Sequence, residues 1–289
     1  MDKKTRLSSI LRIALLACAG SAAILQALAV LISYSNESNY FDTGAILPIL
    51  SAIFVIGGLI CGTVAACMTD SNALHDTPFS ERNEFPIPAI GFVLTAILLP
   101  MHSPAERMTL TLVTSVLLIL AALYSLLSAR AAFRKQHEGL LSFLGMASVV
   151  GCILAAAYFY FDVNLEMNAP LKIAVQLGLI TAMLCYTGEI RFLLGKPMPR
   201  VYLTVTAWTI AAGSLAVLAI PFACITEKLP RIDYAGTAVL VLCIVLTQIL
   251  RMRTLLTCSA EDNSEQAINE INENNDTDGT TDEDGKDLT

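Results

Sequence analysis

Residues 108–128 read MTLTLVTSVLLILAALYSLLS, a run of 21 residues without a charged side chain. An α-helix rises about 1.5 Å per residue, so about 20 residues cross a hydrocarbon core of about 30 Å. Lipid offers the backbone no hydrogen-bond partner, which leaves helices and closed barrels as the spanning structures. The run is continuously apolar and lacks the polar alternation of barrel strands. It therefore predicts a transmembrane helix.

Runs of this kind fill most of the chain. Hydrophobic residues make up 55% of the 289 residues and charged residues only 15%, whereas about 25% charged residues is usual for soluble domains. We divide the chain into a membrane bundle, residues 1–258, and a tail, residues 259–289. The sequence predicts an all-α, polytopic transmembrane helix bundle with eight spans, at about 10–33, 44–68, 86–101, 108–128, 140–161, 170–194, 201–225 and 234–256.

The third predicted span, 86–101, is the shortest, and a re-entrant segment is its alternative. The distribution of Lys and Arg favours a crossing helix. With eight spans and a cytosolic N-terminus, 14 of the 18 bases fall on the cytosolic side. If residues 86–101 do not cross, the split becomes 9 to 9. Cytosolic loops carry the excess of Lys and Arg in membrane proteins, so we expect a multi-pass protein of the cell membrane with both ends in the cytosol.

The N-terminus partly resembles a secretory signal, because a basic start precedes small residues around Cys18. Arg12 interrupts the apolar region, however, and the apolar run continues to Ile32, which is the length of a span. We therefore expect an uncleaved first span.

The tail differs sharply from the bundle. Residues 259–289 carry eleven acids and one base, Lys286, a composition that predicts disorder. The stretch 274–279 resembles the start of a calcium loop, but Gly285 stands where the terminal glutamate ligand belongs. We expect a disordered acidic cytosolic tail. Docking of the tail on the basic ends of the spans is an alternative, and contact of those bases with anionic lipid is another.

Catalytic and cofactor motifs are missing from the sequence. HExxH, GxSxG and P-loop patterns do not occur. His75 and His137 fall in predicted cytosolic loops and His102 falls outside, so the three cannot share one metal site. Seven of the eight cysteines lie within spans and no pair has CxxC spacing. We therefore expect no metal and no cofactor, and we lean against an enzyme.

Among the candidate site residues, Glu189 is the most unusual, because it is a carboxylate within the predicted hydrocarbon region. It lies roughly 10 Å from the midplane of the sixth predicted span, where a carboxylate is costly unless it is paired or protonated. Tyr186 is one helical turn earlier and can donate a hydrogen bond to it. Arg191 points elsewhere, whereas Arg130 or Arg251, at the ends of other spans, could pair with it. A structural tie and a proton- or substrate-linked role both remain open.

Neutral polar residues lie deeper in the predicted spans, and their ordinary role is hydrogen bonding between helices. They would form a substrate-binding site for an uncharged solute only if they converge on one cavity. The candidate substrate-binding residues are Glu189, Tyr186, Gln26, Gln176, Gln248 and Trp208.

Two further features concern helix packing. Gly58 and Gly62 are four residues apart in the second span, a spacing that favours close approach to a neighbouring helix. Pro221 lies inside the seventh span and predicts a kink, because proline removes one backbone hydrogen bond.

Three functions fit the sequence. The first is a non-enzymatic membrane subunit or regulatory module, which agrees with the lack of central charges and catalytic motifs. The second is a permease for a small neutral or amphipathic solute. The third is an intramembrane enzyme, for which Glu189 would need a second reactive group. We expect the lipid bilayer as its surroundings and no nucleic acid, with a membrane-protein partner left open.

Overall fold

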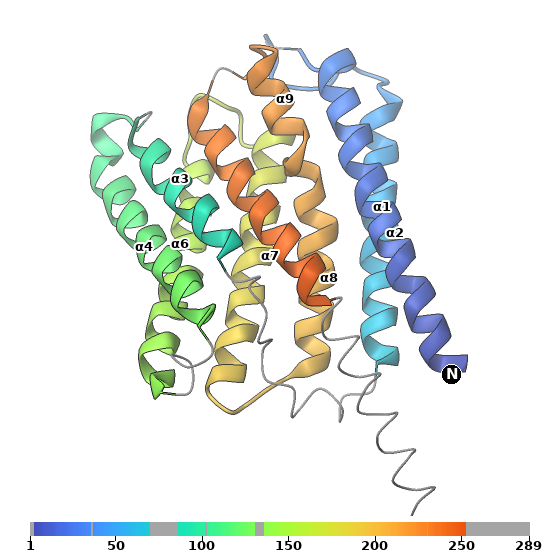
Figure 1. The fold of residues 1–289 in the computed structure, drawn as a ribbon. Coiled ribbons are helices and arrows are strands. Elements are labelled where there is room, and N and C mark those ends of the chain that lie inside the picture. Colours follow the sequence, from blue (N-terminus) through green and yellow to red (C-terminus); the bar gives the residue numbers. More distant parts are fainter. Residues whose placement is uncertain are drawn as a thin grey trace, which may run out of the picture.

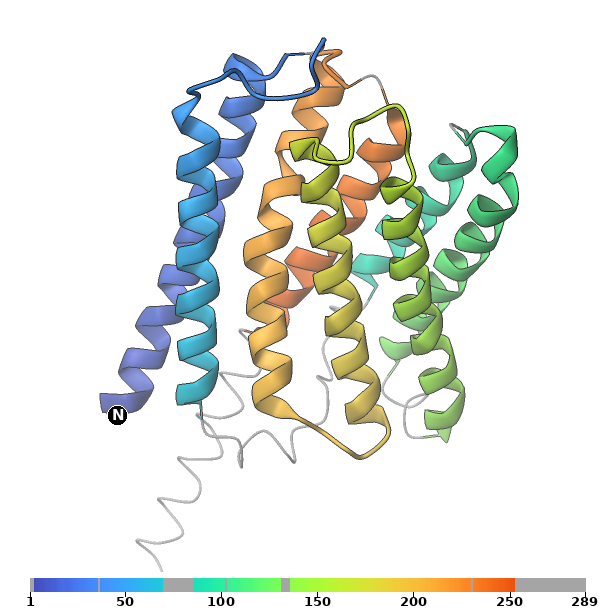
Figure 2. The same ribbon diagram turned by 180° about the vertical axis from the view of Figure 1, so that it is seen from behind.

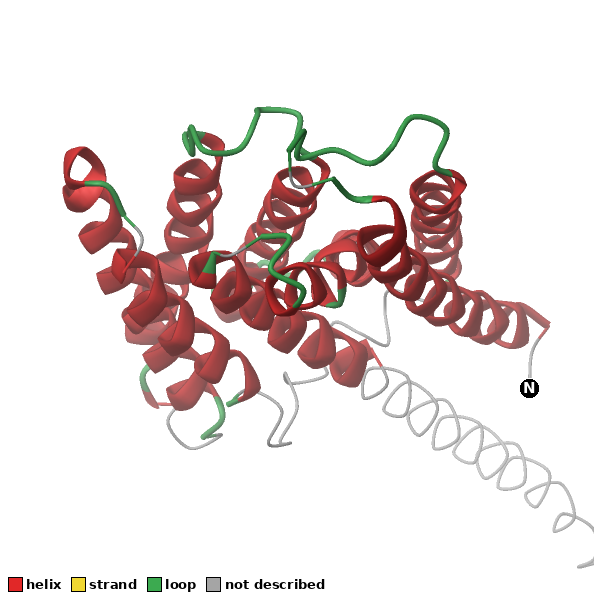
Figure 3. Cartoon of the chain, turned by 90° about the horizontal axis from the view of Figure 1, so that it is seen from above, coloured by secondary structure: helices red, strands yellow, loops and turns green. Residues whose placement is uncertain are grey.

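The computed structural model describes residues 3–35, 37–69, 86–101, 103–130, 136–229 and 231–252. In these ranges the chain forms helices and loops, without a strand, as Figure 3 shows in a view down one end of the bundle. The elements are α1 (Lys3–Ser33), α2 (Ile46–Met68), α3 (Ile87–Met101), the 3-10 turn η2 (Ala105–Arg107), α4 (Met108–Ser128), α6 (Glu138–Tyr160), α7 (Pro170–Leu193), α8 (Pro199–Val217), α9 (Ala219–Ile225) and a last helix, Ile232–Met252.

Among the described residues, seven helical stretches are long and apolar enough to cross a membrane, which indicates an integral membrane protein. They are Arg6–Ser33, Ile46–Met68, Ala105–Ser128, Glu138–Tyr160, Pro170–Leu193, Pro199–Ile225 and Ile232–Met252. The helix at the predicted third span, α3, has only 15 residues. At about 1.5 Å per residue it is about 22 Å long, shorter than a hydrocarbon core of about 30 Å. The all-helical membrane fold is confirmed, whereas a count of eight spans stays a prediction.

Consecutive helices run up and down, so the bundle has two end faces (Figure 1). We call the end where α1 begins the N-terminal face; α2 and α4 end there, and the turn between α7 and α8 lies there. We call the opposite end the far face. It holds the loop between α1 and α2, the turn between α3 and α4, and the loop between α6 and α7. In Figure 1, α3 begins near mid-height and ends at the far face.

Two groups of helices flank a central layer (Figures 1 and 2). The pair α1–α2 packs against α8 and α9 on one side, and α4 packs against α3 and α6 on the other, with α7 between α6 and α8. The last helix lies in the middle. Glycines let it approach its neighbours closely: Gly91 of α3 faces Leu240, Gly178 of α7 faces Val241 and Gly213 of α8 faces Val245.

The predicted small-residue contact of α2 is confirmed. Gly58 and Gly62 face Ala211 and Ala207 of α8, and Gly62 has no room for a side chain. Close backbone contact at small residues is how helices associate in lipid.

The predicted kink is also confirmed, because the helix is interrupted at Leu218, between α8 and α9. Pro221 explains the interruption. It has no N–H to donate to the carbonyl of Val217, four residues earlier.

Candidate functional site

Glu189 lies in the last turns of α7, on a face whose other members, Cys185, Tyr186 and Ala182, are buried. Its side chain is only 2% exposed. Arg251, at the end of the last helix, forms an ion pair with Glu189 Oε1 and is 4% exposed. A partner was required here, because an unpaired carboxylate in an apolar bundle is strongly disfavoured. Of the two arginines that the sequence offered, the structure brings Arg251 to this position.

Neutral groups also contact this pair. The Tyr124 hydroxyl of α4 donates to Glu189 Oε2 over 3.2 Å, and Gln248 Nε2 donates to Oε1 over 3.5 Å. Tyr202 of α8 donates to Gln248 Oε1 over 3.3 Å and accepts from Arg251 Nη1 over 3.4 Å. We call Tyr124, Glu189, Tyr202, Gln248 and Arg251 the Glu189 cluster.

The Glu189 cluster joins four helices: α4, α7, α8 and the last helix. It contains one negative and one positive charge, so it is electrically neutral as a unit. Both carboxylate oxygens accept hydrogen bonds. Proton transfer through Glu189 would therefore first require the ion pair with Arg251 to open. The arrangement is suited to holding helices in register.

Tyr186 does not form the expected hydrogen bond with Glu189. Its buried hydroxyl has no hydrogen-bond partner among the described residues. Its ring packs instead against Phe92 and Tyr124, with centroid distances of 5.7 and 6.3 Å. Tyr124 occupies the position next to the carboxylate that Tyr186 was expected to take. The spacing along α7 could not reveal this, because Tyr124 comes from another helix.

The remaining candidate residues lie in separate places. Gln26 of α1 accepts a 2.6 Å hydrogen bond from Ser51 of α2. Trp208 is 38% exposed on α8, and its Nε1 donates to Thr63 of α2 over 3.0 Å. Gln176 is half-buried in the first half of α7. The structure therefore brings Gln248 to Glu189, places Tyr186 beside Tyr124, and does not gather Gln26, Gln176 and Trp208 around them.

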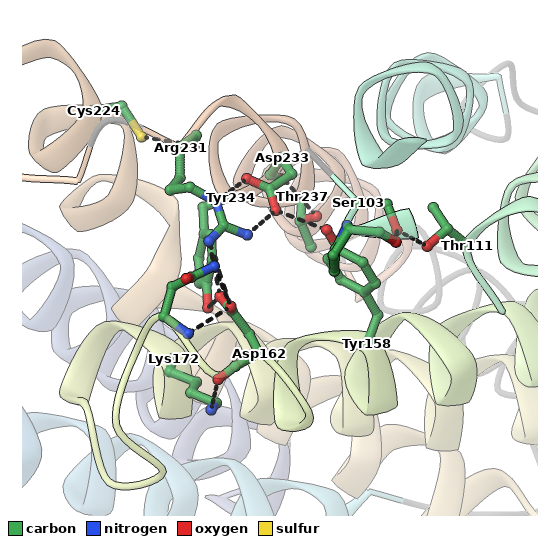
Figure 4. Close-up of polar contacts among 12 residues, drawn as sticks. Ser103, Thr111, Tyr158, Asp162, Lys172, Cys224, Arg231, Asp233, Tyr234 and Thr237 are labelled. Atoms are coloured by element: carbon green, nitrogen blue, oxygen red, sulfur yellow. Dashed lines mark hydrogen bonds and ion pairs between the residues drawn. The ribbon is translucent and has the colours of Figure 1, made fainter. Parts of the chain in front are cut away.

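A second polar cluster, which we did not predict from the sequence, lies at the far face. Figure 4 shows the Arg231 guanidinium between two carboxylates. Arg231 Nη2 and Nε donate to the two oxygens of Asp233 over 2.7 and 3.0 Å, and Nη1 lies 3.2 Å from Asp162 Oδ2. Asp233 is 0% exposed and Asp162 5%. We call Tyr158, Asp162, Arg231, Asp233 and Tyr234 the Asp162 cluster.

Two tyrosines of the Asp162 cluster donate to its carboxylates. The Tyr158 hydroxyl donates to Asp233 over 3.2 Å, and the Tyr234 hydroxyl donates to Asp162 over 3.1 Å. Burial alone would lower the pKa of Arg231. The hydrogen bond and charge of Asp233, together with the charge of Asp162, outweigh burial and raise the pKa of Arg231 above its ordinary value. The cluster thus ties α6 and the loop after it to the start of the last helix.

At the same face, two lysines donate hydrogen bonds to backbone carbonyls at the end of a helix and in a loop. Lys228 Nζ donates to the carbonyls of Val30, Leu31 and Tyr34, at the C-terminal end of α1, over 2.8–3.0 Å. A cation at this position also opposes the negative end of the helix dipole. Lys172 Nζ donates to the carbonyls of Asp162 and Leu165 over 2.8 and 3.1 Å. These lysines therefore stabilise backbone ends.

A signal for the Asp162 cluster was present in the sequence. Asp162 directly follows the aromatic run 158–161, and Asp233 directly precedes Tyr234. Acids embedded in aromatic segments at span ends are candidates for buried pairing, since tyrosine hydroxyls can donate to them. Which acid meets which tyrosine still depends on how α6 and the last helix pack.

Neither cluster can be assigned a chemical role from a metal-binding geometry or from known proteins. In the described part of the chain, no group of three or more His, Cys, Asp or Glu side chains has a geometry that could hold a metal ion. Comparisons with protein-family models, with curated proteins and with solved structures found no match to this chain.

Proposed function

We propose that this chain is a non-enzymatic membrane subunit or regulatory module of the cell membrane, with eight spans and both ends in the cytosol. The observation that carries the proposal is the Glu189 cluster. Among the described acids in membrane-length helices, Glu189 lies furthest from a helix end, and it is neutralised by Arg251 and engaged on both oxygens. A carboxylate that is ion-paired and hydrogen-bonded on both oxygens holds neighbouring helices together.

The scattered polar residues support the same choice over a permease. A pathway for a neutral solute would need several polar side chains around one space. Gln26, Gln176 and Trp208 lie apart from the Glu189 cluster, and Gln26 and Trp208 each bond a side chain of α2.

Charge distribution supports the orientation. The described residues of the N-terminal face carry nine bases and two acids, Glu138 and Glu189. Those of the far face carry four bases and seven acids. Lys and Arg accumulate on the cytosolic side of membrane proteins, so the N-terminal face is proposed to be cytosolic.

The test is solute uptake by proteoliposomes that contain the purified full-length chain, offered a mixture of neutral and amphipathic metabolites. We expect no uptake above protein-free vesicles, for the wild type and for Glu189→Gln alike. Crosslinking in native membranes followed by purification is expected to give a complex of fixed stoichiometry with another membrane protein.

Selective uptake that Glu189→Gln abolishes would replace the proposal with a permease that uses this carboxylate. Selective uptake that survives in Glu189→Gln would give a permease with Glu189 in a structural role. Arg191→Gln, two residues along α7, is the matched control because it changes a neighbouring charge outside the cluster.

A further inference from the structure

Arg12 is a buried arginine in α1 whose charge no acidic side chain of the described residues neutralises. Its side chain is 9% exposed. Arg231 and Arg251, in contrast, both pair with carboxylates. The contact of Arg12 is neutral: Nη2 donates to Thr69 Oγ1 over 2.6 Å, and Thr69 Oγ1 in turn donates to the carbonyl of Ala65 over 2.9 Å. A guanidinium has five N–H donors, and this contact uses one.

A small crevice lies beside Arg12. Its walls include Gly62, Ala65 and Ala66 of α2, Leu203 of α8 and Met252 of the last helix. Three small residues of α2 line this space, and apolar walls strengthen any attraction between Arg12 and an anion. The crevice has room for about one oxygen-sized group, and Arg12 favours an anionic oxygen there.

The surroundings add to this preference. The N-terminal face has a strong excess of bases, and one of its two described acids, Glu189, is already paired with Arg251. An anion that enters the crevice would meet Arg12 in a field that is positive overall.

The chain itself carries matching anions shortly after Met252 in the sequence. Met252 lines the crevice and is the last described residue. Glu261, the first acid of the tail 259–289, is nine residues further on, a distance of at most about 30 Å of extended chain. The tail has eleven acids and one base. Tethering raises the effective concentration of its carboxylates at the crevice far above that of a free anion.

We propose that the crevice beside Arg12 is the docking site of the acidic tail, residues 259–289, with a tail carboxylate bonded to the Arg12 guanidinium. Carboxylate and guanidinium form charge-assisted and often bidentate hydrogen bonds. Docking would place the tail against α1, α2 and α8 at the N-terminal face. This proposal does not depend on the proposed function, because it concerns a different site.

The experiment uses the full-length Arg12→Lys variant in discs of neutral phosphatidylcholine. Lysine keeps the charge and supplies an amine that a carbodiimide couples only to a carboxylate in direct contact. Mass spectrometry then identifies the peptide joined to residue 12. We expect tail peptides, with a yield roughly tenfold above that of the exposed control Arg200→Lys. The product should disappear at about 0.5 M NaCl, where the Debye length is about 4 Å.

Three outcomes would overturn the proposal. Coupling of residue 12 to the segment 70–85, which holds four acids, would assign another occupant. Absence of any coupling at low salt would leave the crevice without an acidic occupant. Loss of the tail product in phosphatidylglycerol discs at low salt would assign the crevice to a lipid phosphate.

The wild-type chain provides a second readout in case the variant is destabilised. In phosphatidylcholine discs, docking should protect the tail from a glutamate-specific protease at low salt and expose it at high salt. Arg12→Gln should be cleaved at the high-salt rate throughout, and Arg200→Gln should follow the wild type. Equal cleavage of the wild type at both salt concentrations, after correction with a soluble tail peptide, would contradict docking.

Discussion

At the scale of single residues, the three buried carboxylates of the bundle are paired with arginines. Glu189 meets Arg251 near the N-terminal face, and Asp162 and Asp233 share Arg231 at the far face. Tyrosine hydroxyls donate to all three carboxylates. Each carboxylate is nearly inaccessible to solvent, so its partners replace the water that burial removes.

The Glu189–Arg251 pair gives the first prediction. Glu189→Gln alone leaves the guanidinium buried without its counter-charge, and Arg251→Gln alone leaves the carboxylate. Each single change should lower the free energy of unfolding by about 3–5 kcal/mol, the range for breaking a buried pair. The double variant should lose less than the sum of the two. Thermal unfolding of the purified protein in detergent measures all three.

Arg191→Gln is the control for this comparison, since Arg191 is half-buried and makes no described ion pair. It should change stability by less than about 1 kcal/mol. Strictly additive losses in the double variant would show that Glu189 and Arg251 do not stabilise each other.

At the scale of elements, the last helix is fixed along its whole length. The Asp162 cluster holds its beginning, the Glu189 cluster holds its end, and glycines of α3, α7 and α8 receive its middle. Van der Waals packing and hydrogen bonds, rather than apolar burial, drive helix association in lipid. The last helix is held by van der Waals packing in its middle and by hydrogen bonds at its two ends.

The contact between α3 and the last helix gives the second prediction. A Cβ at Gly91 would lie 2.6 Å from the Leu240 Cα, and backbone cannot move aside cheaply. Gly91→Ala should therefore destabilise the protein by about 1–3 kcal/mol, as overpacking does. Gly20→Ala should be neutral or slightly stabilising, because nothing lies within 4 Å of the added Cβ and alanine favours helix. Thermal unfolding compares the midpoint temperatures of the two variants. Equal midpoints would refute a tight contact at Gly91.

At the scale of the whole molecule, α1 lies beside the end of the last described helix at Arg12, nine residues after α1 begins. Arg12 and Met252 line the same crevice. The last described helix thus runs toward the N-terminal face, which agrees with the proposed even number of crossings. The short helix α3 would complete that number if the bilayer thins around it.

Topology gives the third prediction. Epitope tags at the N-terminus and the C-terminus of the full-length chain should both be inaccessible to antibodies outside intact cells and become accessible after permeabilisation. The excess of bases at the N-terminal face is the physical reason. A tag placed in the loop between α1 and α2, which lies on the far face, should be accessible without permeabilisation. Accessibility of the two termini from opposite sides would exclude eight spans.

Much of the architecture could be predicted from the sequence because helices in lipid are specified locally. Every backbone hydrogen bond of a helix joins residues four apart, so the apolar run 108–128 was sufficient to predict α4. The contact at Gly62 and the break near Pro221 also follow from local properties, namely a missing side chain and a missing N–H.

Local sequence was therefore sufficient to predict a helical membrane protein, the positions of its long helices and the carboxylate in them that is costly to bury. The partners that offset the cost of burying this carboxylate became apparent only from the packing of the helices. Arg251 reaches Glu189 across 62 residues and Tyr124 across 65, and Tyr186, one turn away, does not. Such contacts depend on the rotation and offset of packed helices, which are set by many small van der Waals contacts at once and leave no periodic pattern along the chain.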